Sequence, residues 1–292
     1  MHDLAQQIVS GLATGSIFAS MALALVLIYR AMGIINFAQG EMAMFTTYIA
    51  WQLAQTGMPL WAAFGLTIVA AFLGGVLLER IVIRPVEGAP PLTAVIVTLG
   101  LLITFNGLAG WFWGYVVKAF PTPFPTTPIQ IGGVGFSAQD VGVIVVSLFT
   151  LGLISLFFQK TKLGLAMRAA ALYPEQSRVL GIRVGWMLAL GWGLASVVGA
   201  ISGIMIAPVV FLDPNMMQSV IVYAFAAAVL GGIESPIGAV VGGLVLGVVI
   251  NLLGSVEWIG NELRLAAALA VIVIVLLVRP AGLFGRVAVH RV

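Results

Sequence analysis

Charged side chains are scarce in this sequence. Only 8% of its 292 residues are Asp, Glu, Lys or Arg, whereas an ordinary soluble domain has roughly 25%. Hydrophobic residues make up 61% of the chain, and the mean hydropathy is +1.16. Because so few polar groups cannot cover a water-facing surface, the composition predicts an integral membrane protein.

Other absences exclude classes of chemistry. The chain has no Cys, which excludes disulfides, thiolate metal sites and cysteine nucleophiles. Its two histidines, His2 and His290, lie near opposite ends, and no metal-binding or serine-nucleophile motif is present. No Lys follows a Gly, so the phosphate-binding loop of an ATPase is missing. We therefore expect no enzyme activity, no metal and no cofactor bound by this chain, and no nucleic-acid partner.

Long uncharged runs separated by turn residues indicate helices. Only helices and closed barrels satisfy all backbone groups in lipid, and the sequence lacks the two-residue alternation of a barrel. The predicted fold is therefore all-α and polytopic: one transmembrane domain over 1–292, with about eight or nine spans and broken or short helices near 30–40 and 231–237. We expect nine apolar helices, at 8–29, 38–55, 59–82, 92–113, 140–159, 186–207, 217–232, 237–254 and 262–278.

The basic residues predict an orientation, because Lys and Arg accumulate in short cytoplasmic loops. If every helix crosses the membrane and the last one ends inside, only Lys118 and Arg264 lie outside. The other 11 of the 13 basic residues then face the cytoplasm: Arg30, Arg80, Arg84, Lys160, Lys162, Arg168, Arg178, Arg183, Arg279, Arg286 and Arg291. The N-terminus is predicted outside and the C-terminus in the cytoplasm.

A first polar segment, INFAQGEM at 35–42, interrupts the apolar helices. Asn36 and Gln39 have the spacing of a capping box, in which the Asn caps a helix and the Gln reaches back from the third position. Glu41 then falls in the first turn, where the helix dipole favours a negative charge. Phe37 and Gly40 complete the segment as candidates for a substrate path.

The second polar segment is GGIESP at 231–236. Gly231 and Gly232 can end one helix, Ser235 can cap the next, and a Pro suits its first position. Glu234 is the carboxylate of this segment.

Two interpretations of these segments remain open. Each can be a loop at the cytoplasmic surface, where Glu41 and Glu234 are solvated and Asn36 and Ser235 only cap helices. Alternatively, each can be a break in a helix that lines a transport path, because irregular backbone at membrane depth persists only beside a cavity.

Two connections between the helices differ in character. Residues 115–140 are rich in Pro and Gly, which excludes a continuous helix and fits either a docking surface or a plain connector. Residues 160–185 are basic and compatible with a helix at about 165–181. Within them, EQSRVLG at 175–181 places Gly181 where a helix would end.

The second of these connections resembles the motif by which permease subunits of bacterial ABC importers engage their ATPases. That motif is Glu-Ala-Ala, three residues, then Gly; here it reads Glu175-Gln176-Ser177, three residues, Gly181, and departs at both Ala positions. Further stretches resemble the branched-chain amino acid (LivH/LivM-type) permease family: GLATGSIFASMALALVLIYR at 11–30, INFAQGEM at 35–42, MRAAALYPEQSRVLGI at 167–182, AFAAAVLGGIESPIGAVVGGLVLG at 224–247 and RPAGLFG at 279–285.

The resemblance implies a transmembrane subunit of an ATP-driven importer in the bacterial cytoplasmic (inner) membrane. Such a subunit pairs with a second, similar permease, two ATPases that hold ATP and Mg, and a periplasmic or lipid-anchored binding protein. Glu175 would contact the ATPase, with Arg168 and Arg178 at the rim. The expected substrates are branched-chain or related amino acids; a urea or amide permease, an ion-coupled secondary transporter and a passive channel remain alternatives.

Overall fold

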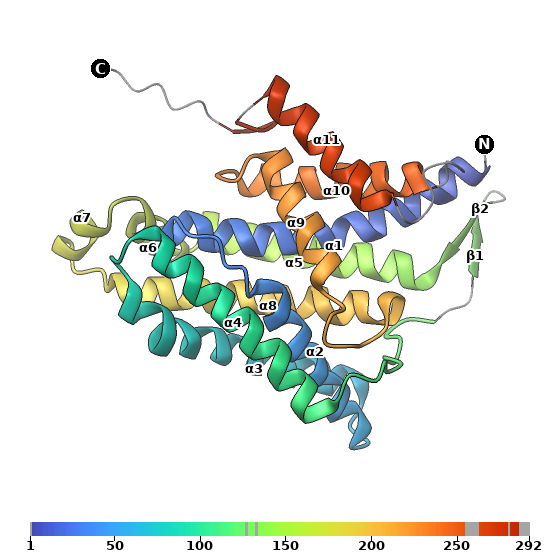
Figure 1. Ribbon diagram of the computed structural model, residues 1–292, viewed down its shortest axis with the longest axis horizontal. Coiled ribbons are helices and arrows are strands. Elements are labelled where there is room, and N and C mark those ends of the chain that lie inside the picture. Colours follow the sequence, from blue (N-terminus) through green and yellow to red (C-terminus); the bar gives the residue numbers. More distant parts are fainter. Residues whose placement is uncertain (1, 126–127, 132–133, 255–262, 280, 286–292) are drawn as a thin grey trace.

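The computed structural model describes residues 2–125, 128–131, 134–254, 263–279 and 281–285. Within them the fold is all-α apart from one short hairpin (Figure 1). The helices are α1 His2–Met32, α2 Gln39–Gln55, α3 Leu60–Leu78, α4 Pro91–Trp113, α5 Ala138–Lys160, α6 Lys162–Leu172, α7 Pro174–Val179, α8 Val184–Val210, α9 Gln218–Gly231, α10 Pro236–Gly254 and α11 Arg264–Val278.

The nine predicted apolar helices are all present, with boundaries that differ by a few residues. Six segments of the described chain are long and apolar enough to cross a membrane: those of α1, α3, α4, α5, α8 and α10. The polar breaks after α1 and after α9 lie where they were predicted, at 33–38 and 232–235. Residue 262, where the last helix was predicted to begin, and the predicted cytoplasmic Arg286 and Arg291 lie outside the described residues.

Helix α1 forms the centre of the bundle. In Figure 1 it runs the length of the molecule, with α10 and α11 on one side and α8 on the other. In its apolar window 83% of the residues are buried, whereas only 17% are buried in the corresponding window of α4. The peripheral helices therefore present apolar side chains outward, as lipid contact requires.

Glycines set how closely α1 and α10 approach. Gly11 and Gly15 of α1 face Gly243 and Gly247 of α10, and a Cβ atom added at Gly247 would overlap the backbone of Gly15. Both pairs have the small-xxx-small spacing that allows helix backbones to meet in lipid. The close crossing of α1 and α10 therefore requires glycine, which has no side chain, at these positions.

Helix α3 ends irregularly. It continues as a π-helical turn, Glu79–Ile83, and a 3-10 turn, Arg84–Val86. The Arg80 guanidinium lies over the ring of Trp186 in α8, 3.7 Å from the ring centroid. This contact ties the end of α3 to the beginning of α8.

The connection between α4 and α5 contains the hairpin. Strand β1 (Pro128–Ile131) pairs antiparallel with β2 (Val134–Ser137), with Pro128 opposite Ser137. Earlier in this connection, Lys118 forms an isolated bridge with Leu212, just beyond α8. The prediction that this stretch is not a continuous helix is confirmed.

Candidate functional site

The first polar segment is buried inside the helix bundle. Asn36, Gln39 and Glu41 are 0%, 0% and 3% exposed. Gly40 packs against Ile221 and Met217, in and just before α9. The solvated-loop interpretation is therefore wrong for Glu41, because its carboxylate is enclosed by the protein.

The predicted capping box is also wrong in its geometry. The Asn36 Oδ1 atom accepts a hydrogen bond from the Ala38 amide at 3.1 Å, and the Asn36 Nδ2 atom donates to Gln39 Oε1 at 3.2 Å. Gln39 does not reach back to the Asn36 amide; its Nε2 atom donates to the carbonyl of Ala195 in α8 at 3.0 Å. Gln39 is the first residue of α2 rather than its third, and it joins the helix break to α8.

The contact between Gln39 and Ala195 shows how deep in the bundle the break between α1 and α2 lies. Ala195 lies eleven residues into α8, which at 1.5 Å per residue is roughly 17 Å along a helix of 27 residues. Gly199, one turn further, has no side chain, and a Cβ atom there would lie 2.6 Å from Gln39 Nε2. The start of α2 thus sits near the middle of a membrane-length helix, and Gly199 provides the space for it.

Further polar groups extend from this junction. Tyr48 lies seven residues after Glu41, on the same face of α2, and its ring stacks on Trp113 with centroids 4.8 Å apart. Asn106 of α4 approaches the Glu41 carboxylate, and Asp213 interacts electrostatically with both Glu41 and Tyr48. The sequence offered one sign of this arrangement: Asn106 is an amide within an otherwise apolar helix.

The connection between α8 and α9 completes this arrangement. Asn106 Nδ2 donates to the carbonyl of Pro214 at 2.8 Å and to Asn215 Oδ1 at 3.1 Å. The Asp213 carboxylate accepts from the Asn215 amide at 2.7 Å. We call Glu41, Tyr48, Asn106, Asp213 and Asn215 the polar strip; it joins α2, α4 and the α8–α9 connection.

The second polar segment lies elsewhere and has a different character. Ser235 Oγ accepts from the Gly238 amide at 3.0 Å, so the predicted cap is confirmed, and Glu234 is exposed. Gly231 and Gly232 are buried, and the Phe284 amide donates to the Gly231 carbonyl at 3.0 Å. The surface-loop interpretation therefore holds for Glu234.

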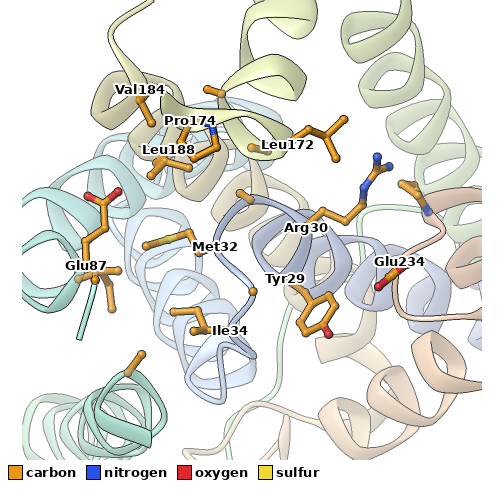
Figure 2. A pocket seen from close by; sticks show the side chains of 18 of the residues that line it. Tyr29, Arg30, Met32, Ile34, Glu87, Leu172, Pro174, Val184, Leu188 and Glu234 are labelled. Carbon is orange, nitrogen blue, oxygen red and sulfur yellow. The ribbon is translucent and has the colours of Figure 1, made fainter. Parts of the chain in front are cut away.

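A cavity of about 1110 Å³ adjoins this second segment (Figure 2). Arg30, Glu87, Pro174, Val184 and Glu234 are among the residues that line it, so the ends of five separate segments meet here. We call this end of the bundle the basic end, because several of the Arg and Lys residues predicted to be cytoplasmic lie at the helix ends found here. Both polar segments begin there, but only the first continues into the bundle interior.

Helices α6 and α7 form the connection between α5 and α8 at the basic end. Thr161 caps α6 by accepting from the Gly164 amide at 2.9 Å, and Pro174 begins α7. The prediction of one helix at 165–181 is wrong, because Pro174 cannot continue α6 and a break forms at Tyr173. Gly181 has φ +81°, the left-handed conformation expected of the glycine that follows a helix.

The residues of the predicted coupling motif separate into two environments. Glu175 and Arg178 form an ion pair on the surface of α7, with side chains 76% and 54% exposed, and Gln176 is exposed beside them. Ser177 is buried. Arg168 instead lines a cavity between α1, α5, α6 and α10, so it lies apart from this pair.

Comparison with known proteins gives the family. Residues 7–278 match the family model described as "Branched-chain amino acid transport system / permease component". The chain belongs to this family. It is a multi-pass membrane protein and a transport permease component.

Individual relatives agree over the full length. The chain is 32% identical to the high-affinity branched-chain amino acid transport system permease protein BraD of Pseudomonas aeruginosa, covering 100% of this chain and 99% of the relative. It is 29% identical to LivH of Escherichia coli K12, a permease protein of a system with the same description, covering 98% and 97%. A solved structure of PsaBC from Streptococcus pneumoniae in complex with Fab matches the fold with a TM-score of 0.50 and 15% identity, covering 91% of this chain and 89% of that one.

Proposed function

We propose that this chain is the transmembrane permease subunit of an ATP-driven importer for branched-chain or related amino acids. It works by alternating access in the bacterial cytoplasmic membrane, with its N-terminus outside and its basic end in the cytoplasm. A binding protein delivers the substrate, a second similar permease completes the path, and two ATPase subunits hold ATP and Mg. Family membership and the names of the relatives support this assignment.

The observation that carries the proposal is the exposed surface of α7. Val179 and Leu180, at its C-terminal end, are 88% and 80% exposed, beside the Glu175–Arg178 ion pair. Apolar side chains rimmed by charges mark a protein contact. Figure 1 shows α7 standing beyond the ends of the long helices, where a cytoplasmic ATPase could reach it.

Helix α8 connects this surface to the buried junction, by which we mean Asn36 and Gln39 at the start of α2 and Ala195 of α8. It begins at Val184, a few residues after α7, and its Ala195 carbonyl holds Gln39. A displacement of α7 is therefore transmitted to the start of α2 through one continuous helix, α8. This is a short mechanical route from ATP hydrolysis to the interior of the bundle.

The polar strip supplies the substrate chemistry. Glu41 in the buried interior and Asp213 in the half-buried α8–α9 connection place two carboxylates along one face, and their negative potential suits the ammonium group of an amino acid. Buried carboxylates in membrane proteins are costly and mark substrate or ion pathways. In this proposal the ammonium group passes Glu41 while apolar walls accept the branched side chain.

The proposal is tested by a double variant of α7 produced with its partner subunits. Glu175→Lys replaces the ion pair with repulsion from Arg178, and Gly181→Pro demands φ near −65° where the chain has +81°. We expect unchanged amounts in the membrane but loss of ATPase copurification and of uptake. Glu87→Lys, a charge reversal at an exposed position of the basic end outside α7, is the control and should retain both. Normal uptake by the double variant would refute the role of α7.

A further inference from the structure

A second cavity at the basic end is lined by apolar side chains at its inner end and by basic side chains at its outer end, as a phospholipid site requires. It has a volume of about 660 Å³ and lies between α1, α5, α6, α8 and α10. It shares Arg30 and Ser235 with the first cavity, and neither Gln39 nor Ala195 lines it. Figure 1 shows α1, α5 and α6 meeting at this end of the bundle. The volume falls in the range of small-molecule pockets, roughly 300–1,000 Å³.

Its walls change from apolar to basic along the helix axes. On α1, Leu23, Leu27 and Arg30 have the i, i+4, i+7 spacing of one helix face, so the apolar side chains lead to the guanidinium at the helix end. On α5, Ile154 and Phe158 lead in the same way to Gln159. An occupant must therefore have an apolar portion inside and a polar portion at the basic end.

The charges of the cavity are of one sign. Its lining residues include Arg30 and Arg168 and no Asp or Glu. Among the described residues, neither guanidinium has a carboxylate within 4.0 Å, and the buried Nε atom of Arg168 has no hydrogen-bond partner. Figure 2 shows the Arg30 side chain extending from the end of α1 on the side away from Glu87 and on the same side as Glu234, which lines the first cavity. Burying a charged donor without a partner is costly, so the position of the Arg168 Nε atom favours an anionic ligand.

The cavity lies where lipid can enter it. Leu153 and Leu156 of α5, beside its walls, are 50% and 57% exposed and form part of the apolar outer surface. Gly152 lines the cavity, and a Cβ atom added there would meet no atom within 4 Å. The missing side chain leaves open space at the apolar end.

We propose that this cavity binds one anionic phospholipid, with its phosphate group on Arg168 and Arg30 and an acyl chain between α1, α5 and α10. Basic pockets between transmembrane helices on the cytoplasmic side are suited to such headgroups. The lipid phosphate gives the Arg168 guanidinium an anionic partner, and the acyl chain occupies the open space at Gly152. Arg168 thereby acts in lipid binding instead of at the rim of an ATPase contact.

The test measures retained lipid. The chain, purified with its partner subunits, is reconstituted into phosphatidylcholine bilayers with increasing fractions of phosphatidylglycerol, recovered in detergent and analysed by mass spectrometry. Arg168→Gln should lower phosphatidylglycerol retention by about fivefold, the effect expected for one basic residue at an anionic headgroup. Lys162→Gln is the matched control, because Lys162 is an exposed basic residue of the same helix outside the cavity walls, and it should retain lipid as the unmodified protein does.

A second variant tests the apolar part without changing charge. Gly152→Leu fills the open space and should also lower retention, whereas Arg168→Lys should preserve most of it. Equal phosphatidylglycerol retention by Arg168→Gln, Gly152→Leu and Lys162→Gln would overturn the proposal. So would equal retention of phosphatidylcholine by the unmodified protein, or displacement of phosphatidylglycerol by millimolar inorganic phosphate, which would show a site for the free anion.

Discussion

Replacing Gln39 with Leu should separate ATP hydrolysis from transport. The Gln39 side chain is 0% exposed and makes two hydrogen bonds, one to Asn36 and one to the Ala195 carbonyl of α8. Leu fills similar space but makes neither bond. The substitution therefore removes the contact through which α8 holds the start of α2 while leaving α6 and α7 unchanged.

The stability cost of this change should be small. Hydrogen bonds between helices in membranes contribute about 0.6 kcal/mol each on average. Asn36 Nδ2 keeps a weak contact with the Met42 sulfur at 3.6 Å, so it is not left without any partner. Gln39→Leu should therefore lower the free energy of unfolding by about 1 kcal/mol, too little to prevent assembly.

The assay compares uptake and ATP hydrolysis in proteoliposomes that contain the complete transporter. Gln39→Leu should lose most uptake per folded molecule and keep its ATPase activity. Gln52→Leu is the matched control, since Gln52 lies on the same helix and accepts a hydrogen bond from Trp113 at 3.1 Å, but is exposed and distant from the junction. If Gln39→Leu transports as well as Gln52→Leu, α8 does not act through Gln39.

Two further substitutions test the path and the packing. Glu41→Gln removes the buried carboxylate proposed to meet the substrate ammonium group. Hydrogen bonds to charged groups contribute roughly 1.5–3 kcal/mol, so uptake efficiency should fall by about 10- to 160-fold. Glu234→Gln, at an exposed carboxylate, should have little effect in the same uptake assay, and equal losses would remove Glu41 from the path. Gly247→Ala forces α1 and α10 apart and should lower the free energy of unfolding by about 1–3 kcal/mol. Gly100→Ala, where no atom lies within 4 Å of an added Cβ atom, should not, and equal thermal stabilities of the two variants would contradict the close crossing.

The sequence predicted the helices well because their limits are local. Gly, Pro and polar residues mark most helix ends, whereas the pairing of α1 with α10 through Gly11, Gly15, Gly243 and Gly247 is visible only in the structure. The break between α6 and α7 was predictable from Pro174, since Pro is not tolerated in a helix interior. The residues around it, LAMRAAALYPEQ at 165–176, are mostly helix formers, which is why one continuous helix was predicted.

The functional geometry was less accessible because it depends on distant residues. Gln39 and Ala195 are 156 residues apart, and nothing near Gln39 in the sequence distinguishes a cap from a contact with another helix. The same limit applies to Asp213, which reaches the Glu41 region from the α8–α9 connection. Arg168 was predicted at the rim of the ATPase contact because it lies in the same basic connection as the motif, whereas in the structure it lines the cavity between helices.

The central claim is that ATP hydrolysis on partner subunits drives amino-acid import through this chain. It is tested most directly by uptake of labelled leucine into proteoliposomes that contain the complete assembly, with ATP supplied on the side of the ATPases. We predict that vanadate abolishes uptake and that a protonophore leaves it unchanged. Uptake that survives vanadate and stops with the protonophore would contradict the account and identify an ion-coupled transporter.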